Sequence, residues 1–584
     1  MRKYYQLFLV LCLFLVISKS GTSQNNRGQK SDFPGNGKYN SSLLGKYAFV
    51  LDPGMDMKEI QTLIDTLYNM QHERKSEFST NRYALLFKPG TYQLNIKMGY
   101  YMHALGLGKS PDDVVINGDL ISKGLFNNGN VTCNFWRSVE NLTMVPTGDS
   151  TMIWGVSQAA PMRRVHVKGS IQLHDHGWAS GGFLADSKID GTVYSGPQQQ
   201  WFSRNDDLGA WKGGSWNMMF VGVHGAPAEK WPANPYTVIT ETPEIREKPY
   251  LFLDNGDYSV AVPKLKKNSS GVSWMNQPED VDVLKLSSFY LVTPTDQSAS
   301  INAALKAGKN LLFTPGIYPI NESLKITRPG TVVMGIGMAT LVSANGNSII
   351  EISDVDRVTM CGLLFDAGKL NADKLLQVGE PNSHKNHAKQ PSYLFDLFFR
   401  VGGPAEGSAS SCFVINSNNV RVDHTWIWRA DHGNGVGWDK NKSANGLIVN
   451  GDHVTIYGLF NEHFQEYQTI WNGEHGRLYF YQSELPYDPP TVDSWKHGGT
   501  GGYASYKVSD KVKSHEAIGL GIYCVFYQAP VIVDNTIETP QKLEKNIHHK
   551  IIFWLNGNKE SKILNVINGK GDGVNITRRK TVME

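Results

Sequence analysis

An internal duplication constrains the fold of this chain more than any other feature of its sequence. The octapeptide Leu85–Tyr92, LLFKPGTY, returns in the later half of the chain as Leu311–Tyr318, LLFTPGIY. Each copy follows a segment predicted as a short helix, around Met57–Met70 and Ser298–Ala307. Because 584 residues exceed what one ordinary core supports, the repeat predicts two homologous halves.

Within each half, short stretches of alternating apolar residues recur at a nearly constant interval in the low twenties. Leu142, Val165 and Ile189 mark three of them in the first half, and Val454 and Leu478 mark two in the second. Period-two alternation is typical of strands, and a longer period of that size is typical of coils that stack on one another. The sequence therefore predicts an all-β fold of two parallel β-helices. An antiparallel sandwich, with turns about every 8 to 12 residues, fits less well.

These signals divide the chain into four predicted segments. They are a leader over residues 1–23, a first β-helix over 24–245, a connector over 246–288, and a second β-helix with a C-terminal extension over 289–584. The leader has a basic start and an unbroken apolar run from Leu7 to Ile17, which predicts a cleaved signal peptide too short to span a bilayer. We therefore expect a secreted or periplasmic protein that has no membrane span and acts as a monomer.

Charge and cysteine content narrow the function further. The chain carries 57 basic and 54 acidic residues, so its formal charge of +3 gives no electrostatic reason to expect nucleic acid as a partner. The cysteines beyond the leader are too widely spaced for a CxxC metal site or a disulfide framework, and buried free thiols are favoured over a single bridge. His174 and His176 have no third ligand at a recognised spacing. We expect no metal and no cofactor.

The stretch from Gly458 to Asp488 concentrates carboxylates, amides and aromatic side chains. The interval between its acids Glu462 and Glu484 is close to one predicted coil. In a β-helix, residues one coil apart stack about 4.8 Å apart, and two carboxylates that close raise the pKa of one of them. A carboxylic acid that stays protonated can protonate the leaving oxygen of a glycoside. An acidic ladder on a solvent-exposed face is the alternative that the residues leave open.

Several blocks of the second half resemble the signature segments of glycoside hydrolase family 55. They are Trp426–His432, Gly446–Gly451, Gly458–His463, Ile470–Gly473 and Gln482–Asp488. Members of that family are secreted β-1,3-glucanases, mostly exo-acting, built as two tandem right-handed, pectate-lyase-like β-helices that form a rib-cage. The resemblance spans nearly the whole chain after the leader. It implies an inverting exo-hydrolase of β-1,3-glucan such as laminarin.

The resemblance also implies roles for four residues. Glu484, in the block QSELPYD, matches the general acid of the family, and Glu462 matches its neighbouring acid. Gln158 and Ser180, in the first half, match the groups that hold the attacking water, and they are separated by the same interval as the two acids. Neither of these two is a general base of the usual kind. Two acids about 5 Å apart would, by spacing alone, indicate retention of configuration instead of inversion.

Other side chains near these four have the amide, aromatic or charged groups that bind sugars. As substrate contacts we expect Gln199, Gln200, Trp201, Asp431, His432, His463, Tyr467, Trp471 and Tyr487. Trp178 and Trp438 are candidates of the same kind. For each, the alternative is a core aromatic or a hydrogen-bonded polar group of the helix wall. For the whole protein, the alternatives are a calcium-dependent polysaccharide lyase and a glycan-binding β-helix without turnover.

Overall fold

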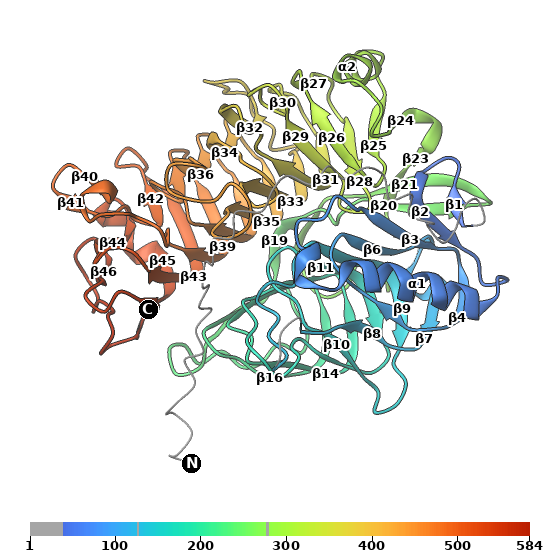
Figure 1. Ribbon diagram of the computed structural model, residues 1–584, viewed down its shortest axis with the longest axis horizontal. Coiled ribbons are helices and arrows are strands. Elements are labelled where there is room, and N and C mark those ends of the chain that lie inside the picture. The colour runs from blue at the N-terminus through green and yellow to red at the C-terminus, as the bar shows by residue number, and fades with distance from the viewer. Residues whose placement is uncertain (1–38, 125–127, 276–278) are drawn as a thin grey trace, which may run out of the picture.

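Two stacks of short strands lie side by side in the computed structural model, which describes residues 39–124, 128–275 and 279–584 (Figure 1). Strands β1 to β18 make the first stack and β24 to β47 the second, and within each stack the strands pair mainly in parallel, one coil apart. The predicted fold of two tandem parallel β-helices is therefore confirmed. The expected leader, residues 1–23, lies outside the described residues.

The first stack has an inner ladder, which faces the second stack, and a set of outer strands. The inner ladder runs through β2 (Gly45–Leu51), β3 (Tyr83–Phe87), β6 (Met102–Gly106), β9 (Arg137–Val145), β11 (Pro161–Val167), β13 (Phe183–Ala185), β15 (Gln200–Arg204), β17 (Asn217–Val221) and β18 (Tyr236–Ile239). The other strands are β1 (Asn40–Ser41), β4 (Gly90–Gln93), β5 (Ile96–Lys97), β7 (Val114–Asn117), β8 (Leu120–Ser122), β10 (Thr151–Trp154), β12 (Ser170–Gln172), β14 (Lys188–Gly196) and β16 (Asp207–Gly213).

The second stack repeats this plan with longer strands. Its inner ladder runs through β24 (Phe289–Val292), β25 (Asn310–Phe313), β28 (Val332–Gly335), β31 (Thr359–Asp366), β33 (Tyr393–Val401), β35 (Arg421–Arg429), β37 (Thr455–Glu462), β39 (Gly476–Glu484), β43 (His515–Phe526), β45 (Ile547–Gly557) and β47 (Lys580–Met583). Its other strands are β26 (Ile317–Ile320), β27 (Leu324–Ile326), β29 (Thr340–Ser343), β30 (Ile350–Ile352), β32 (Ala372–Val378), β34 (Ala409–Ile415), β36 (Asn445–Val449), β38 (Thr469–Trp471), β40 (Lys496–His497), β41 (Thr500–Gly501), β42 (Tyr506–Val508), β44 (Ile532–Glu538) and β46 (Lys562–Ile567).

Antiparallel strands connect the two stacks. They are β19 (Thr242–Ile245), which pairs with β22 (Lys266–Ser269), and the three-stranded sheet of β20 (Tyr250–Asp254), β21 (Asp257–Pro263) and β23 (Val281–Lys285). Described residues of this segment thus hydrogen-bond to one another in these strands and also to the first stack, where the Leu253 N–H donates to the carbonyl oxygen of Leu107 over 2.9 Å.

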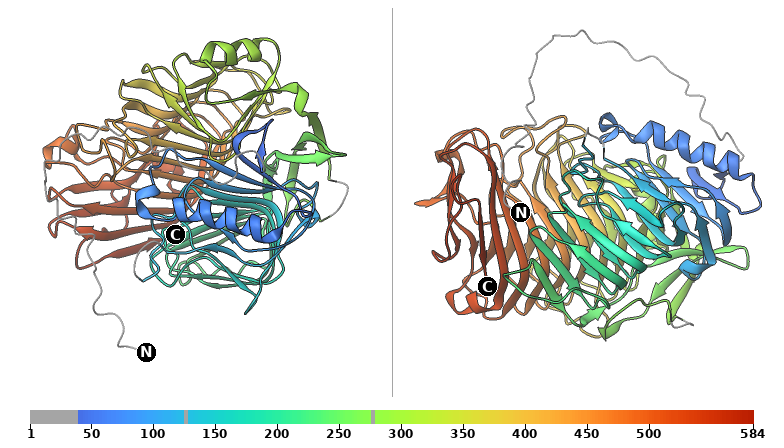
Figure 2. Two further views of the ribbon diagram at one scale, coloured as in Figure 1. Left: turned by 45° about the vertical axis from the view of Figure 1, so that its right-hand side comes forward. Right: turned by 90° about the horizontal axis from the view of Figure 1, so that it is seen from below.

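Two α-helices occur among the described residues, both where the sequence predicts them. Helix α1 (Met57–Gln71) begins after Asp56, whose carboxylate accepts from the backbone N–H groups of the first turn, and α2 (Ser298–Lys306) precedes β25. Figure 2 shows α1 along one side of the first stack, where its apolar face joins the core. No helix in the described ranges is long and apolar enough to cross a membrane.

The coil spacing follows the sequence prediction with one systematic error. Leu142 pairs with Val165, as expected. Ile189, however, pairs with Val167 instead of Val165, and Leu478 pairs with Ile456 instead of Val454, so both coils are shorter than expected by one alternation. A register shift by one full alternation leaves the same side chains on the same face of the strand. The alternation in the sequence therefore predicts which side chains share a face, but it does not predict the register.

The duplicated octapeptides form the same strand–turn–strand unit in both halves. Leu85 and Leu311 lie in the separate cores of the two stacks, whereas Leu86 and Leu312 lie in one apolar cluster between the stacks. A second cluster between the stacks is rich in aromatic rings, including Trp136. Both faces of the inner strands are therefore buried, one inside its own coil and the other against the opposite stack.

Each inner ladder carries a column of residues with positive φ, one in each coil from β9 to β17 and from β31 to β45. In the first stack these are Asn141, Arg164, Asp186, Asn205 and Gly222, and in the second they include Gly362, Asp396, His424, Gly458, Phe480 and Gly519. Pairing skips these positions: Phe395 pairs with Asp423 and Leu397 with Thr425. A left-handed residue other than glycine costs about 1–2 kcal/mol, so this kink is maintained by packing. It delivers polar side chains to the junction of the stacks.

Candidate active site

The two predicted acids lie on neighbouring inner strands of the second stack. Strand β37 ends at Glu462 and β39 ends at Glu484, and Phe460 pairs with Gln482 on the next coil. Continued by two residues, this pairing register places Glu462 beside Glu484. The backbone N–H of His463 donates to the carbonyl oxygen of Glu484 over 2.8 Å. Only 2% of Glu462 and 9% of Glu484 is exposed. The acidic ladder is thus internal and does not form a solvent-exposed face.

Glu462 is surrounded by N–H donors. Gln158 Nε2 donates to Glu462 Oε1 over 3.0 Å, and Trp426 Nε1 donates to Oε2 over 2.9 Å. Burial raises the pKa of Glu462 to about 7, while hydrogen bonds from Trp426, Gln482 and Gln158 oppose the rise. N–H donors stabilise a carboxylate more than a carboxylic acid, so the contacts of Glu462 favour its ionised form.

Glu484 has no N–H donor as close as those of Glu462 among the described residues, and it lies beside other negative charges. The hydroxyl of Tyr487 donates to Glu484 Oε2, and Gln482 Nε2 lies 3.5 Å from Oε1, at the limit of a hydrogen bond. Burial raises the pKa of Glu484 well above its usual value, and the charges of Glu462 and Asp431 raise it further. Two coupled acids whose surroundings differ in this way hold one proton between them near neutral pH, and Glu484 is the member that keeps it.

Gln158 and Ser180, from the first stack, reach the acid pair across the junction. Ser180 Oγ donates to Gln158 Oε1 over 3.0 Å, and the Gln158 amide donates to Glu462, 304 residues away. Both side chains are buried. A hydroxyl that donates one hydrogen bond retains lone pairs, so Ser180 Oγ can also accept one from water. The four residues to which the resemblance assigns roles therefore form one cluster.

Four of the predicted substrate contacts adjoin this cluster. The His463 ring packs edge-on against Tyr487 at 4.3 Å, and its Nε2 lies 4.0 Å from Glu462 Oε2. Asp431 accepts from His432 Nδ1 over 2.8 Å. About a quarter of the Asp431 side chain and a fifth of the His432 side chain are exposed. Burial opposes the charge of His432, but Asp431 and a second carboxylate raise its pKa to about 10. These residues mark the rim of the site.

For two tryptophans the prediction of sugar contact is wrong. Trp471 is fully buried inside the second stack, with its ring 4.6 Å from that of His515. Trp201 is 1% exposed in the core of the first stack, directly over Gly182. Both lie at positions that point into their own coil, where no sugar ring can reach an indole face. The core alternative applies to each.

Other candidates also lie away from the acids or have structural contacts. The Tyr467 ring packs against the rings of Tyr503 at 5.2 Å and His497 at 5.6 Å, beside the outer strands. The prediction that Tyr467 contacts substrate is therefore wrong. Gln200 is buried, and its Nε2 donates to the carbonyl oxygen of Ser180. It therefore supports the backbone of Ser180 and does not face a sugar.

Three more of the sequence candidates are only partly enclosed. Gln199 is half-buried, and its carbonyl oxygen accepts from Trp216 N over 2.9 Å. Trp438 is half-buried against the second core, with the Arg429 guanidinium 5.5 Å from its ring. Trp178, just before Ser180, has 55% of its surface exposed. Of the predicted aromatic candidates, Trp178 therefore offers the largest open ring face.

Sequence reasoning missed three side chains that build the site. Trp426 and Gln482 bind the acids, and His424 Nε2 lies 3.1 Å from the carbonyl oxygen of Gln158. Trp426 and Gln482 stood inside blocks that carried the resemblance, but alternation does not tell which of two neighbouring positions faces an acid. His424 occupies a kinked position with φ of 67°, for which the sequence has no signal.

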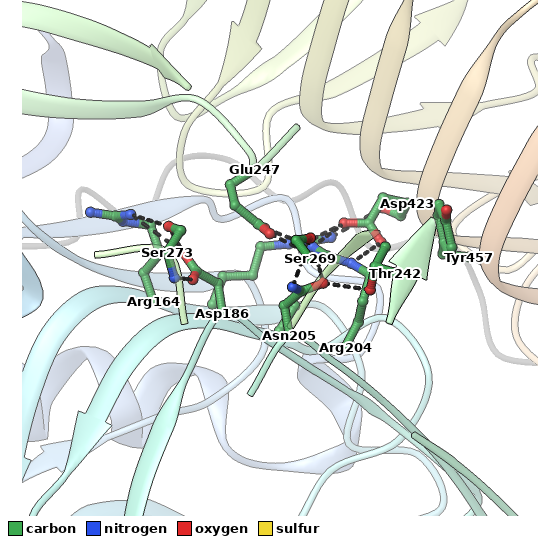
Figure 3. Close-up of polar contacts among 12 residues, drawn as sticks. Arg164, Asp186, Arg204, Asn205, Thr242, Glu247, Ser269, Ser273, Asp423 and Tyr457 are labelled. Carbon is green, nitrogen blue, oxygen red and sulfur yellow. Dashed lines mark hydrogen bonds and ion pairs between the residues drawn. The ribbon is translucent and has the colours of Figure 1, made fainter. Parts of the chain in front are cut away.

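A buried ionic network fixes the stacks relative to each other. Arg163 Nε binds Asp396 Oδ2 over 2.8 Å, and its Nη1 binds Asp423 Oδ2 over 2.7 Å. Arg204 lies between Asp423 and Glu247, at 2.9 and 2.7 Å (Figure 3). Buried charges are tolerated only when paired, so these contacts permit one alignment of the inner ladders.

Asp396 links this network to the acid pair. Besides Arg163, it binds Lys248 Nζ at 3.0 Å and His424 Nδ1 at 2.8 Å. Burial raises the pKa of Asp396, but Arg163, Lys248 and His424 outweigh burial and hold it well below its usual value. His424 in turn contacts Gln158, so one chain of contacts runs from the centre of the junction to the residue that binds Glu462.

The chain is similar to known carbohydrate-active proteins. Residues 289–484 match the LAM55 pectate lyase-like domain. An exo-beta-1,3-glucanase of Streptomyces sp. (strain SirexAA-E / ActE) is 45% identical over 533 residues, which are 91% of this chain and 87% of that protein.

Solved structures show the same similarity in three dimensions. The structure of sacteLam55A from Streptomyces sp. SirexAA-E has a TM-score of 0.89 and 43% identity, and covers 92% of this chain and 98% of that one. A glutamate-to-alanine variant of sacteLam55A in complex with glucose has a TM-score of 0.89 and 42% identity, and covers 93% and 98% of the two chains. The similarity therefore extends over both stacks and the junction between them.

Proposed function

Because the chain belongs to glycoside hydrolase family 55, with the exo-β-1,3-glucanase that it matches, we propose that it is an exported exo-acting hydrolase of β-1,3-glucan. The observation that carries the proposal is the buried pair of Glu462 and Glu484, whose surroundings favour opposite protonation states. The predicted leader supports export. The glucanase relative supports the linkage and the mode of attack.

In the proposed reaction, Glu484 protonates the glycosidic oxygen as the bond to the leaving chain breaks. Ionised Glu462 keeps the proton on Glu484 until it is needed and stabilises the positive charge that develops at the anomeric carbon. Ser180 and Gln158 orient the water that attacks from the opposite side, which inverts the configuration. Both stacks are needed because the acids come from one stack and the water-holding pair from the other.

The test is a product analysis on laminarin with the full-length protein. Exo action predicts that glucose or one short product appears from the first time point while the polymer shortens slowly. Inversion predicts that proton NMR of the first product shows the α-anomer before mutarotation. Early oligosaccharides of mixed length would indicate endo action, an initial β-anomer would indicate retention, and laminarin bound without cleavage would favour a binding protein.

The pH profile should report the coupling between the acids. Activity requires protonated Glu484, so kcat/KM falls as pH rises through its pKa. In Glu462→Gln, we expect the alkaline limb to move to lower pH, because a negative charge that raises the pKa of Glu484 is lost. The measurement is kcat/KM for laminarin against pH in both proteins. As a matched control, Glu516→Gln on β43, half exposed, should leave the limb in place. An unmoved limb in Glu462→Gln contradicts the coupling.

Tyr527 is placed to support the leaving chain beyond Glu484. Its ring is 59% exposed and packs edge-on against Tyr487, 5.7 Å away, whose hydroxyl binds the acid. We expect Tyr527→Ala to raise KM for laminarin about fivefold, equivalent to about 1 kcal/mol of stacking, with kcat little changed. Laminaribiose, with one leaving sugar, should show a smaller change. Leu370→Ala, also at 59% exposure, is the control, and an equal KM shift in both variants contradicts the role.

A further inference from the structure

Three potential metal ligands converge at the rim of the site, and the proposed reaction gives none of them a chemical step. Glu77, Cys133 and His432 each bring one ligand atom within 4.8 Å of the other two. Glu77 follows the short helix η1 (Arg74–Ser76) and Cys133 precedes β9, both in the first stack, whereas His432 follows β35 in the second. The cluster therefore spans the junction of the stacks.

The ligand types match one metal class. A carboxylate oxygen, a thiolate sulfur and an imidazole nitrogen are the donors that Zn²⁺ combines in proteins, and the thiol disfavours Ca²⁺ and Mg²⁺, which take oxygen ligands. Three protein ligands leave the fourth tetrahedral position to water. Glu77 is buried, while Cys133 and His432 are partly exposed, so the metal has access from solvent.

His432 is oriented as a metal ligand usually is. Its Nδ1 lies 2.8 Å from Asp431 Oδ1, and its Nε2 points at Glu77 Oε1, 2.7 Å away. Zinc-bound histidines commonly hold a carboxylate on one nitrogen and the metal on the other. Arg74 binds the second oxygen of Glu77, Oε2, at 2.6 Å, so Oε1 is the atom available to a metal.

The charge balance permits the exchange of protons for a metal. Since both nitrogens of His432 face carboxylates, the imidazole carries a proton on each. Zn²⁺ would displace the proton on Nε2 and the thiol proton of Cys133, both of which leave to solvent. Two protons exchanged for one divalent ion leave the local charge unchanged, so Arg74 and Asp431 keep their partners.

We propose that Glu77, Cys133 and His432 form a zinc-binding site that links the two stacks at the rim of the active site. The metal takes no part in hydrolysis. It replaces the proton that now bridges Glu77 and His432 with coordinate bonds, and it holds the loop after β35 against the first stack. The site extends the proposed function without depending on it.

The test is a titration of metal-free full-length protein with zinc chloride by calorimetry. We expect one equivalent to bind and the melting temperature to rise. Cobalt(II), used as a spectroscopic probe, should give a thiolate-to-metal charge-transfer band in the near ultraviolet. No saturable binding, or cobalt binding without that band, would overturn the proposal.

Variants locate the site independently of activity. Cys133→Ser and His432→Gln should each weaken zinc binding at least about tenfold, or about 1.4 kcal/mol. Cys133→Ser should melt like the wild type when no metal is added, which separates lost ligation from misfolding. His176→Gln, in the other histidine pair with His174, is the matched control and should bind as the wild type does. Unweakened binding in Cys133→Ser, or lost binding in His176→Gln, places the metal elsewhere and refutes the assignment.

Discussion

Replacing Glu484 with glutamine is expected to lower kcat on laminarin about 10²–10⁴-fold, the usual contribution of a general acid, while the protein stays folded. Glutamine keeps the size of the side chain and can still bond to Tyr487, but it has no proton to give to the leaving oxygen. The measurement is the rate of glucose release under saturating substrate, together with a thermal melt of each protein.

A second substrate distinguishes the loss of the general acid from a general loss of activity. β-Glucosyl fluoride has a leaving group that needs little protonation, so Glu484→Gln should hydrolyse it far closer to the wild-type rate than it does laminarin. Glu538→Gln, a half-buried glutamate paired with Lys507 on the outer strands, is the matched control and should leave both rates unchanged. Substantial laminarin turnover by Glu484→Gln would refute its role as the acid.

Asp396→Asn is expected to lower the free energy of unfolding by about 3–5 kcal/mol, because it leaves buried cations without their counter-charge. Asp396 is 1% exposed and binds Arg163 and Lys248 at once. The shift in the midpoint of urea unfolding, followed by tryptophan fluorescence, measures the loss. Glu351→Gln, from the exposed pair with Lys325, should change stability by no more than about 1 kcal/mol. A loss for Asp396→Asn as small as that would show that the network does not hold the stacks together.

The stabilisation from Asp396 should also depend on pH with a definite sign. Its folded pKa is depressed, because Arg163 and Lys248 outweigh the effect of burial. The contribution is therefore fully present above the unfolded pKa of about 3.9 and is lost as pH falls through the folded value. The difference in stability between wild type and Asp396→Asn should stay constant near neutral pH and shrink only in acid.

Some features of this molecule are local in sequence and were therefore predictable. The repeated octapeptide indicated two halves, and the interval from Glu462 to Glu484 equals one coil of the second stack. Gln158 and Ser180 were found by resemblance, and their shared interval indicated that they too would be neighbours. The two neighbour inferences need only residues one coil apart, and the repeat needs only a comparison of two short segments of the sequence.

Features that depend on the junction were not predictable. Every residue of β35 is buried, so alternation cannot tell which side chains face the coil interior and which face the other stack. Trp201, on the equally buried inner strand β15, was misassigned for this reason. The pairing of Arg163 with Asp396 joins residues 233 apart, and no periodicity within either half encodes it. The positive-φ column that presents Asp396 and His424 is likewise a property of packing.

The hydrogen bond from Gln158 to Glu462 has a consequence for how such a protein can change in length. One extra coil before either residue would move it about 4.8 Å along its axis, which breaks a contact of 3.0 Å. An added or deleted coil in one half therefore requires a matching change in the other. A longer loop between two strands shifts no coil, so loop length can change without breaking this hydrogen bond. In related chains we expect loop lengths to vary at a fixed coil count up to the acids, and whole coils to be gained or lost only after Glu484.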